Sequence, residues 1–135
     1  MDHLTFIALL VATSGWTPAT PRQEIAGMKC FHEGASVRLT GIVTHRMFYG
    51  APNYGETPKT DRRVRVAILR LESPITPCEL TEFDRDDRKL GEPVREVQVD
   101  AWPSQLKTGA RRTFAGTIHA ATIGPDYLDY VLDVP

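Results

Sequence analysis

The chain has 135 residues, of which 41% are hydrophobic and 24% are charged. This composition favours one small folded domain and excludes a disordered chain or a polytopic membrane protein. Sixteen Lys and Arg residues oppose seventeen Asp and Glu residues, and the resulting net charge of −1 argues against a dedicated nucleic-acid binder. Ten prolines and ten glycines favour short strands and turns over long helices.

The N-terminus resembles an export signal. Residues 4–12 are apolar except for Thr5, and small or turn-forming residues follow. The stretch is too short to span a bilayer, so we predict a signal peptide over residues 1–19, with cleavage after Ser14 or after Ala19. This prediction places the protein in the periplasm or outside the cell, without an integral membrane span.

The residues beside this apolar stretch leave one alternative to a signal peptide. His3 stands where Lys or Arg is usual in a signal peptide, and Asp2 is acidic, so a buried N-terminal strand or helix is the alternative. Residues 20–29 have no apolar period and are predicted to be a linker. Residues 30–135 then form one domain.

Cys30 and Cys78 are the only two cysteines. In an exported protein, a single pair of cysteines favours a disulfide, which here is worth about 4 kcal/mol in the chain-entropy model. Two separate buried thiols are the alternative. A metal site is less well supported, because the sequence has no His-x-x-x-His pattern or second cysteine pair to complete a ligand set.

Five segments alternate apolar and polar residues, as half-buried strands do. They span residues 36–44, 64–71, 96–101, 111–120 and 127–134. The second changes its frame by one residue between Ile68 and Leu69, which suggests a β-bulge. Residues 104–109 fit one helical turn that ends at Gly109.

A glycine lies in the middle of the first and fourth predicted strands, at Gly41 and Gly116. Such glycines allow a long strand to bend sharply and to pair in both halves of a small barrel. The predicted fold is therefore all-β: a small five-stranded antiparallel OB-like barrel with at most one or two short helical turns. A small β-sandwich is the alternative.

Two long connections interrupt these strands. Residues 49–62 are rich in Gly, Pro and Asn and predict an exposed loop. Residues 79–93 mix acidic and basic side chains, and we predict a solvated connection there. A calcium site is not favoured in the second connection, because basic residues lie among its acids and no twelve-residue calcium loop is present.

Several motifs together resemble a family of exported bacterial domains, domain-of-unknown-function family 4431. They are Cys30, Val37-Arg38-Leu39-Thr40-Gly41, Phe48-Tyr49-Gly50-Ala51-Pro52-Asn53-Tyr54-Gly55-Glu56, Leu69-Arg70-Leu71-Glu72-Ser73-Pro74-Ile75, Cys78 and Phe114-Ala115-Gly116-Thr117-Ile118-His119. The resemblance covers about residues 28–134. It implies export, the disulfide and the fold, and it implies no particular activity.

The chain also departs from that family. Tyr49 and Ala51 replace two prolines of the family motif. Only His119 remains where family members have a histidine-rich stretch, so no metal site is carried over to this chain.

The sequence contains no arrangement typical of an enzyme. His3, His32, His45 and His119 lie in separate segments, and we expect His45 on the inner face of the first strand. The chain lacks Gly-x-Ser-x-Gly, His-Glu-x-x-His and phosphate-binding glycine motifs. We therefore predict no catalytic residues, no metal and no cofactor.

The loop between the first two predicted strands is the candidate binding site. Its aromatic and turn-forming residues offer contact area on a backbone restrained by proline. The predicted binding residues are Phe48, Tyr49, Asn53, Tyr54, Arg62 and Arg63. A basic patch that adds Arg65, Arg111 and Arg112 is a further hypothesis. The alternative is that Phe48 and Tyr54 fold down to cap the barrel, and residues 79–92 are then the better candidate surface.

These observations favour a non-enzymatic protein that binds and blocks another protein, such as a toxin or an envelope hydrolase, as immunity proteins and inhibitors do. No nucleic acid is expected as a partner. A small-ligand or glycan binder of the envelope, and a structural accessory domain, are the alternatives. The sequence leaves the oligomeric state open.

Overall fold

The computed structural model describes residues 30–80, 88–89, 91–101, 106–122 and 125–135. The predicted signal peptide, its cleavage sites and the linker lie outside the described residues, as does most of the charged connection. Across the described ranges, no helix is long and apolar enough to cross a membrane.

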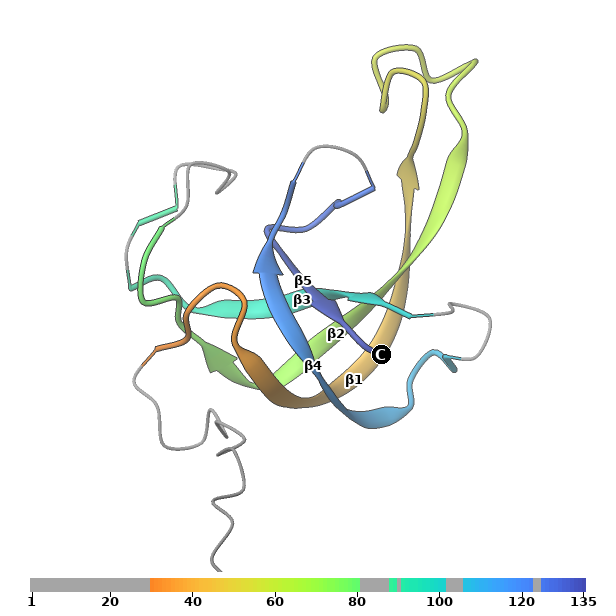
Figure 1. Cartoon of the computed structure of the whole chain (residues 1–135). Helices are drawn as coiled ribbons and strands as arrows, with labels where there is room; N and C mark the ends of the chain where they lie inside the picture. The colour runs from red at the N-terminus through yellow and green to blue at the C-terminus, as the bar shows by residue number, and fades with distance from the viewer. Residues whose placement is uncertain (1–29, 81–87, 90, 102–105, 123–124) are drawn as a thin grey trace, which may run out of the picture.

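Five strands form a closed barrel in the order β1-β2-β3-β5-β4 (Figure 1). Their bounds are β1 Ser36–Tyr49, β2 Arg63–Ile75, β3 Val94–Asp100, β4 Arg111–Ala120 and β5 Tyr130–Asp133. The predicted all-β class with five strands in a closed barrel is confirmed. The described residues contain no helix, and the described part of the predicted helical turn, residues 106–109, ends in a turn with Gly109 at φ +87°.

One strand pair departs from the predicted antiparallel arrangement. β3 and β5 run parallel, with Gln98 opposite Val131, whereas the other four neighbouring pairs are antiparallel. The reason is geometric, because strand directions cannot alternate all the way round a closed ring with an odd number of strands. A five-stranded barrel must contain a parallel pair, and the sheet is mixed.

Gly41 and Gly116 lie where their strands exchange partners, as predicted. Gly41 is opposite both Leu71 of β2 and Arg112 of β4. A Cβ at Gly41 would lie 2.0 Å from the carbonyl oxygen of Arg70, and one at Gly116 would lie 2.1 Å from that of Asp133. Only glycine allows the backbones to approach this closely, so these two positions let the sheet close.

The bulge predicted at Ile68 and Leu69 is wrong. The register between β1 and β2 is continuous from Gly41–Leu71 to Tyr49–Arg63, and the irregularity in β2 lies later, beyond Arg70 on the β3 side. Val66, Ala67, Ile68 and Leu69 are all buried because both faces of β2 are covered here. Ala67 and Leu69 belong to the barrel core, while Ile68 lies outside that core cluster, on the opposite face of the strand.

The connection between β4 and β5 covers this outer face of the sheet. The Gln98 side chain donates to the Pro125 carbonyl oxygen at 3.0 Å, and its own oxygen accepts from the Tyr127 N–H at 2.7 Å. Both polar ends of the buried Gln98 are therefore paired with this connection. The connection is thereby fixed against β3, beside the groove described below.

The predicted disulfide is present between Cys30 and Cys78. It joins the segment before β1 to the segment after β2, where Phe31 donates to the Thr76 carbonyl and Cys78 donates to the Phe31 carbonyl. The Phe31 ring packs edge-on against Tyr130 with centroids 5.3 Å apart. The disulfide therefore closes one end of the core.

Candidate functional site

The clearest candidate is the arm, which we define as residues 44–67. It comprises the second half of β1, the connection and the start of β2. Within the described chain, pairing of β1 with β4 ends at Ile42 and pairing of β2 with β3 begins at Ile68. Apart from Thr44, which lies opposite Ile68, the strand residues of the arm therefore pair only with each other. Figure 1 shows the arm extending away from the barrel. The predicted loop is thus the end of a projecting hairpin.

One carboxylate organises the end of the arm. Asp61 is only 7% exposed, and its two oxygens accept from the N–H groups of Asn53 at 2.9 Å, Gly55 at 2.7 Å and Thr57 at 3.2 Å. The Thr57 hydroxyl donates to the same carboxylate at 3.1 Å. Four donors from one side of the loop therefore converge on a residue from the other side.

These donors also set the charge of Asp61. Burial disfavours the charged carboxylate, but the hydrogen bonds from Asn53, Gly55 and Thr57 outweigh it and hold the pKa of Asp61 below its ordinary value of 3.8. Asp61 is ionised at neutral pH, and its negative charge is directed at the N–H and hydroxyl donors inside the loop. Sequence analysis missed this residue, because its role depends on backbone groups that composition does not reveal.

The loop displays Tyr54 to solvent. Tyr54 has a φ of +50°, Gly55 follows at +102°, and the Tyr54 side chain is 52% exposed. The Asn53 side chain, also predicted to bind, donates to the Thr57 hydroxyl at 2.8 Å. The Tyr54 side chain therefore does not cap the barrel. The Asn53 side chain stabilises the loop from which Tyr54 extends into solvent.

An aromatic stack near the end of β1 holds the arm against the β4–β5 connection. Phe48 lies on the Tyr127 ring with centroids 4.7 Å apart and an angle of 24° between the planes. A Cβ at Gly50 would lie 2.7 Å from the Val64 side chain and 3.3 Å from the Tyr127 hydroxyl, so only glycine fits beside this stack. Burial raises the pKa of Tyr127, with a further contribution from nearby Tyr54. Phe48 thus anchors the arm to the β4–β5 connection rather than capping the barrel.

The opposite face of the arm is open and basic. The Arg63 guanidinium lies over the Tyr49 ring, 4.8 Å from its centroid, and Met47 beside it is 47% exposed. Arg65 reaches the Thr108 hydroxyl at 3.5 Å. Among the described residues, neither Arg63 nor Arg65 forms an ion pair. Arg62 is also exposed. All six binding residues predicted from the sequence therefore lie in the arm.

Arg111 and Arg112 do not join this surface. Arg111 forms an ion pair with Glu72 and lies opposite Ile42, whereas Arg65 lies opposite Met47. Ile42 and Met47 are five positions apart in an extended strand, about 17 Å. The extended basic patch predicted from the sequence is therefore wrong, because the two ends belong to different parts of β1.

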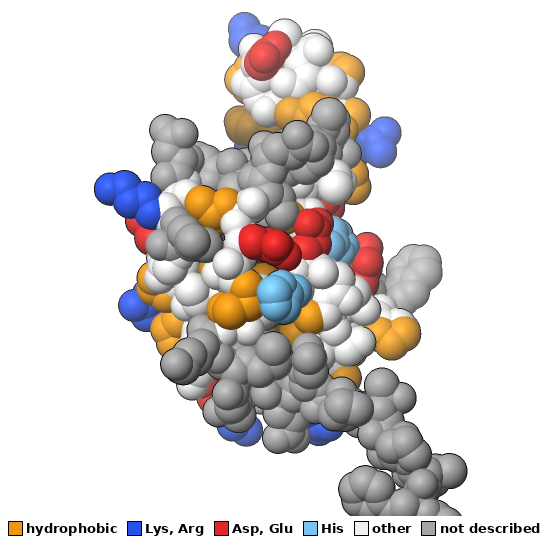
Figure 2. Space-filling model, turned by 60° about the vertical axis from the view of Figure 1, so that its left-hand side comes forward, with side chains coloured by type: hydrophobic (Ala, Val, Ile, Leu, Met, Phe, Trp, Pro, Cys, Tyr) orange, Lys and Arg blue, Asp and Glu red, His pale blue; other side chains and the backbone are white. Residues whose placement is uncertain are grey.

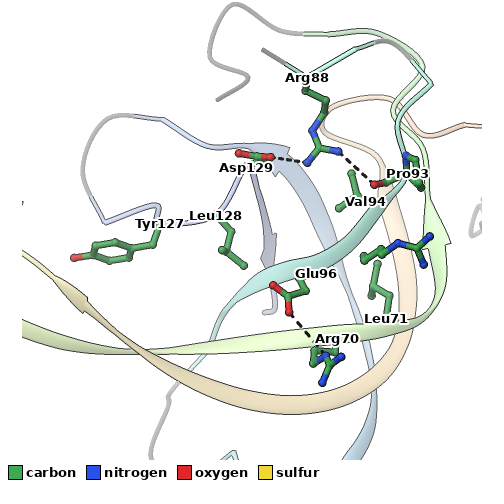
Figure 3. A pocket seen from close by; sticks show the side chains of 10 residues that line it. Arg70, Leu71, Arg88, Pro93, Val94, Glu96, Tyr127, Leu128 and Asp129 are labelled. Atoms are coloured by element: carbon green, nitrogen blue, oxygen red, sulfur yellow. Dashed lines mark hydrogen bonds and ion pairs between the residues drawn. The ribbon is translucent and has the colours of Figure 1, made fainter. Parts of the chain in front are cut away.

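A groove lies beside the arm, between β2, β3 and the β4–β5 connection (Figure 3). Its volume is about 710 Å³, and Tyr127 is one of its lining residues. The Arg88–Asp129 ion pair, 2.5 Å long with side chains 16% and 18% exposed, lies at one end. Arg70 and Glu96, 3.8 Å apart, lie at the other. Sequence analysis did not single out this groove.

The described lining of the groove contains apolar side chains and arginine–carboxylate pairs. Tyr127 lines the groove and also stacks on Phe48, so the groove lies next to the arm.

A second set of titratable residues lies on the outside of β3, β4 and β5. Asp100 and Asp133 are neighbours in the β3–β5 pair, and the His119 Nδ1 lies 3.5 Å from an Asp133 oxygen. Desolvation, then the hydrogen bond and charge of Asp133, raise the pKa of Asp100 above 3.8. In the part of the chain that the structure describes, no three His, Cys, Asp or Glu residues are arranged to hold a metal ion.

The other two described histidines, His32 and His45, lie in separate places. The His45 Nδ1 lies 2.6 Å from the Thr108 hydroxyl, and the His32 Nδ1 lies 3.3 Å from a Glu79 carboxylate oxygen. His45 is half-buried on the inner face of β1, as expected from the alternation.

No protein-family model matches the chain, and no curated protein or solved structure gives a significant match. The resemblance to domain-of-unknown-function family 4431 therefore stays a prediction.

Proposed function

We propose that this chain is an exported, non-enzymatic protein that binds another protein through the arm and blocks its activity, as immunity proteins and inhibitors do. The observation that carries the proposal is the presentation of Tyr54. Tyr54, which is 52% exposed, lies on a loop that is held by three backbone hydrogen bonds and one hydroxyl hydrogen bond to Asp61. Tyrosine is enriched among residues that dominate protein interfaces, and a rigid loop loses little entropy on binding.

The periplasm or the cell exterior is the proposed location. The Cys30–Cys78 disulfide supports it, because disulfides persist in oxidising compartments. The apolar residues 4–12 support it independently. N-terminal sequencing of the protein from a periplasmic fraction tests the location, with a mature chain that begins at residue 15 or residue 20 expected.

Affinity capture with matched variants tests the arm. The wild-type chain, Tyr54→Ala and Ile42→Ala are immobilised in turn and exposed to periplasmic extract. Ile42 is the control, because it is a 37% exposed apolar residue on the barrel. We expect a protein held by wild type and Ile42→Ala and bound at least tenfold more weakly by Tyr54→Ala, within the 1–3 kcal/mol of an ordinary interface anchor. Equal retention by all three chains would reject the arm as the contact.

Blocking is a separate part of the proposal and has its own readout. The captured protein is assayed alone and with a saturating amount of this chain. Loss of its activity in the complex supports the immunity or inhibitor role, and unchanged activity rejects it. Tyr49→Ala is expected to weaken the same complex by 1–3 kcal/mol, because Tyr49 carries Arg63 on its ring.

The groove favours a second candidate function, the binding of a small molecule or glycan of the envelope. Its volume of about 710 Å³ lies within the range of ligand sites. Leu128→Trp reduces the groove without altering the arm. Loss of a small-molecule ligand in this variant, with protein capture unchanged, would assign the groove its own role.

A further inference from the structure

We propose that the partner contributes an acidic extended segment, which pairs as an added strand with the open edge of β2 at Arg63 and Arg65. This inference rests on the proposed function and specifies the chemistry of the partner. Three observations carry it: the direction of the backbone groups, the charge of the arm and the placement of the two arginines.

The hydrogen-bond pattern shows which backbone groups face outward. The Gly50 N–H donates to the Arg62 carbonyl at 2.6 Å, and the Arg62 N–H donates to the Ala51 carbonyl at 2.9 Å, so the backbone groups of Arg62 face the β1 side of the hairpin. Bonded pairs alternate along an antiparallel ladder, so Arg63 and Arg65 direct their N–H and C=O groups away from β1. None of the described residues pairs with β2 between Arg63 and Ala67 on that side. With respect to the described residues, this stretch of β2 is therefore an unpaired edge and a template for another strand.

The charge of the arm selects an acidic strand. Residues 44–67 contain five basic and two acidic residues, a net charge of +3, whereas the whole chain carries −1. One of the two acids is Asp61, whose carboxylate is engaged inside the loop. Figure 2 shows the arm at the top of the molecule, with Lys and Arg side chains standing out from it.

The positions of Arg63 and Arg65 also predict the spacing of the acidic residues on the partner strand. Arg63 and Arg65 alternate on β2 and therefore lie on one face of it, about 7 Å apart along the strand. The Arg63 guanidinium lies over the Tyr49 ring, and Arg63 forms no ion pair among the described residues. A partner strand with acidic residues at two alternate positions places one carboxylate beside each guanidinium.

The same residues disfavour two other occupants. A second copy that paired edge to edge would bring arginines against arginines, and like charges directly opposite one another destabilise a sheet. A polyanion such as nucleic acid or a sulfated glycan matches the charge but cannot satisfy a row of backbone N–H and C=O groups. The open edge therefore favours a polypeptide.

Selection from a displayed random twelve-residue peptide library tests the chemistry. We expect enrichment of peptides with two acidic residues at alternate positions. The affinity of a selected peptide should fall at least tenfold for the double variant Arg63→Glu/Arg65→Glu. It should change less than twofold for Arg38→Glu/Arg112→Glu, which changes the charge equally at exposed barrel positions. Failure to enrich acidic peptides, or equal losses in both double variants, would overturn the proposal.

Amide exchange of the complex tests strand addition itself. In the proposed complex, exchange of the Arg63 and Arg65 amides slows, and N-methylation of alternate residues of the selected peptide abolishes binding. Protection confined to other residues, or full binding by the N-methylated peptide, would overturn the pairing. Binding of heparin or single-stranded DNA with the same dependence on Arg63 and Arg65 would identify a polyanion site and would also overturn it.

The two proposals fail separately. Tyr54-dependent capture that is unaffected by Arg63→Gln/Arg65→Gln leaves the arm as a protein contact and removes the acidic strand. These neutral variants also keep the test valid if reversed charges disturb the hairpin, and their folding is checked by circular dichroism. Loss of all Tyr54 dependence removes the proposed function itself.

Discussion

The barrel and the arm are ordered by different interactions. In the barrel, Leu69, Val97, Ile118 and Leu132 are completely buried in one hydrophobic core. In the arm, order comes from hydrogen bonds to Asp61 and from the aromatic stack of Phe48 on Tyr127. A core uses its large side chains for its own stability, whereas a loop held by backbone hydrogen bonds leaves aromatic side chains available to a partner. The difference predicts which substitutions affect stability and which affect binding.

Loss of the disulfide should have the largest effect, and the effect should fall on the barrel. Cys30→Ser with Cys78→Ser opens a crosslink between residues 48 positions apart, which is worth about 4 kcal/mol in the chain-entropy model. We expect the free energy of unfolding, measured in urea, to fall by about that amount. The free energy of the local opening that exposes the Asn53 and Gly55 amides to exchange should stay as it is in the wild-type chain. A loss below about 1 kcal/mol would show that the disulfide is not a main support of the barrel.

Gly116→Ala should destabilise the barrel by about 3 kcal/mol, at the upper end of the usual cost of overpacking. The added methyl would lie 2.1 Å from the Asp133 carbonyl oxygen, so β4 and β5 must separate. Gly34→Ala is the control, because nothing lies within 4 Å of its Cβ and only its φ of +80° opposes the change. That strain costs about 1 kcal/mol. Equal losses in the two variants would contradict the close approach of β4 to β5.

The barrel could be predicted from the sequence because its determinants are local. Alternation gave the five strands, and the glycines at positions 41 and 116 indicated the two bends. The consecutive apolar residues Val66 to Leu69 led to the wrong prediction of a bulge. Alternation assumes that one face of a strand is exposed to solvent, but here the β4–β5 connection covers that face of β2. The parallel pair follows from closing a ring of five strands, which no single segment encodes.

Phe48→Ala tests whether the arm is independent of the barrel. Phe48 is half-buried against Tyr127, and its loss should reduce the free energy of unfolding by about 2 kcal/mol. A double-mutant cycle with Tyr127→Ala should give a coupling energy of about 1 kcal/mol, typical of a stacked pair. A coupling near zero would mean that the arm is attached only through its own strands.

The candidate site was only partly accessible from the sequence. Aromatic residues around Pro52 indicated a binding loop, and Tyr54 is exposed as that prediction requires. The support for the loop was not accessible, because Asp61 acts through backbone N–H groups and Tyr127 reaches Phe48 from another part of the chain. Such contacts depend on the closed barrel and have no signature in residue spacing.

Asp61→Asn should loosen the arm while leaving the barrel nearly unchanged. An amide keeps one acceptor oxygen and turns an NH₂ group toward N–H donors, so the hydrogen bonds of one carboxylate oxygen are lost. We expect faster amide exchange at Asn53, Gly55 and Thr57, with little change in the thermal midpoint of the barrel. Asn53→Ala, which removes only the side-chain bond to Thr57, is the milder control. Equal acceleration in the barrel core would mean that the arm and the barrel open as one unit.

Acid should act in opposite directions on the arm and on the outside of the barrel, and this is the smallest expected effect. The pKa of Asp61 is lowered in the folded chain, so its support of the arm is complete above the ordinary value of 3.8 and is lost as the pH falls through the lower folded value. The pKa of Asp100 is raised, so its contribution is fully present below 3.8 and is lost as the pH rises through the higher folded value. Amide exchange in the arm should therefore accelerate below pH 3.8 beyond its intrinsic pH dependence, and Asp61→Asn should remove that change. Asp133→Asn removes the neighbouring carboxylate and should move the Asp100 titration, followed by NMR, toward 3.8 without altering the response of the arm. The prediction fails if the arm and the barrel show the same pH response, or if Asp133→Asn leaves the Asp100 titration unchanged. Asp61 and Asp100 would then not report separately on the arm and the barrel.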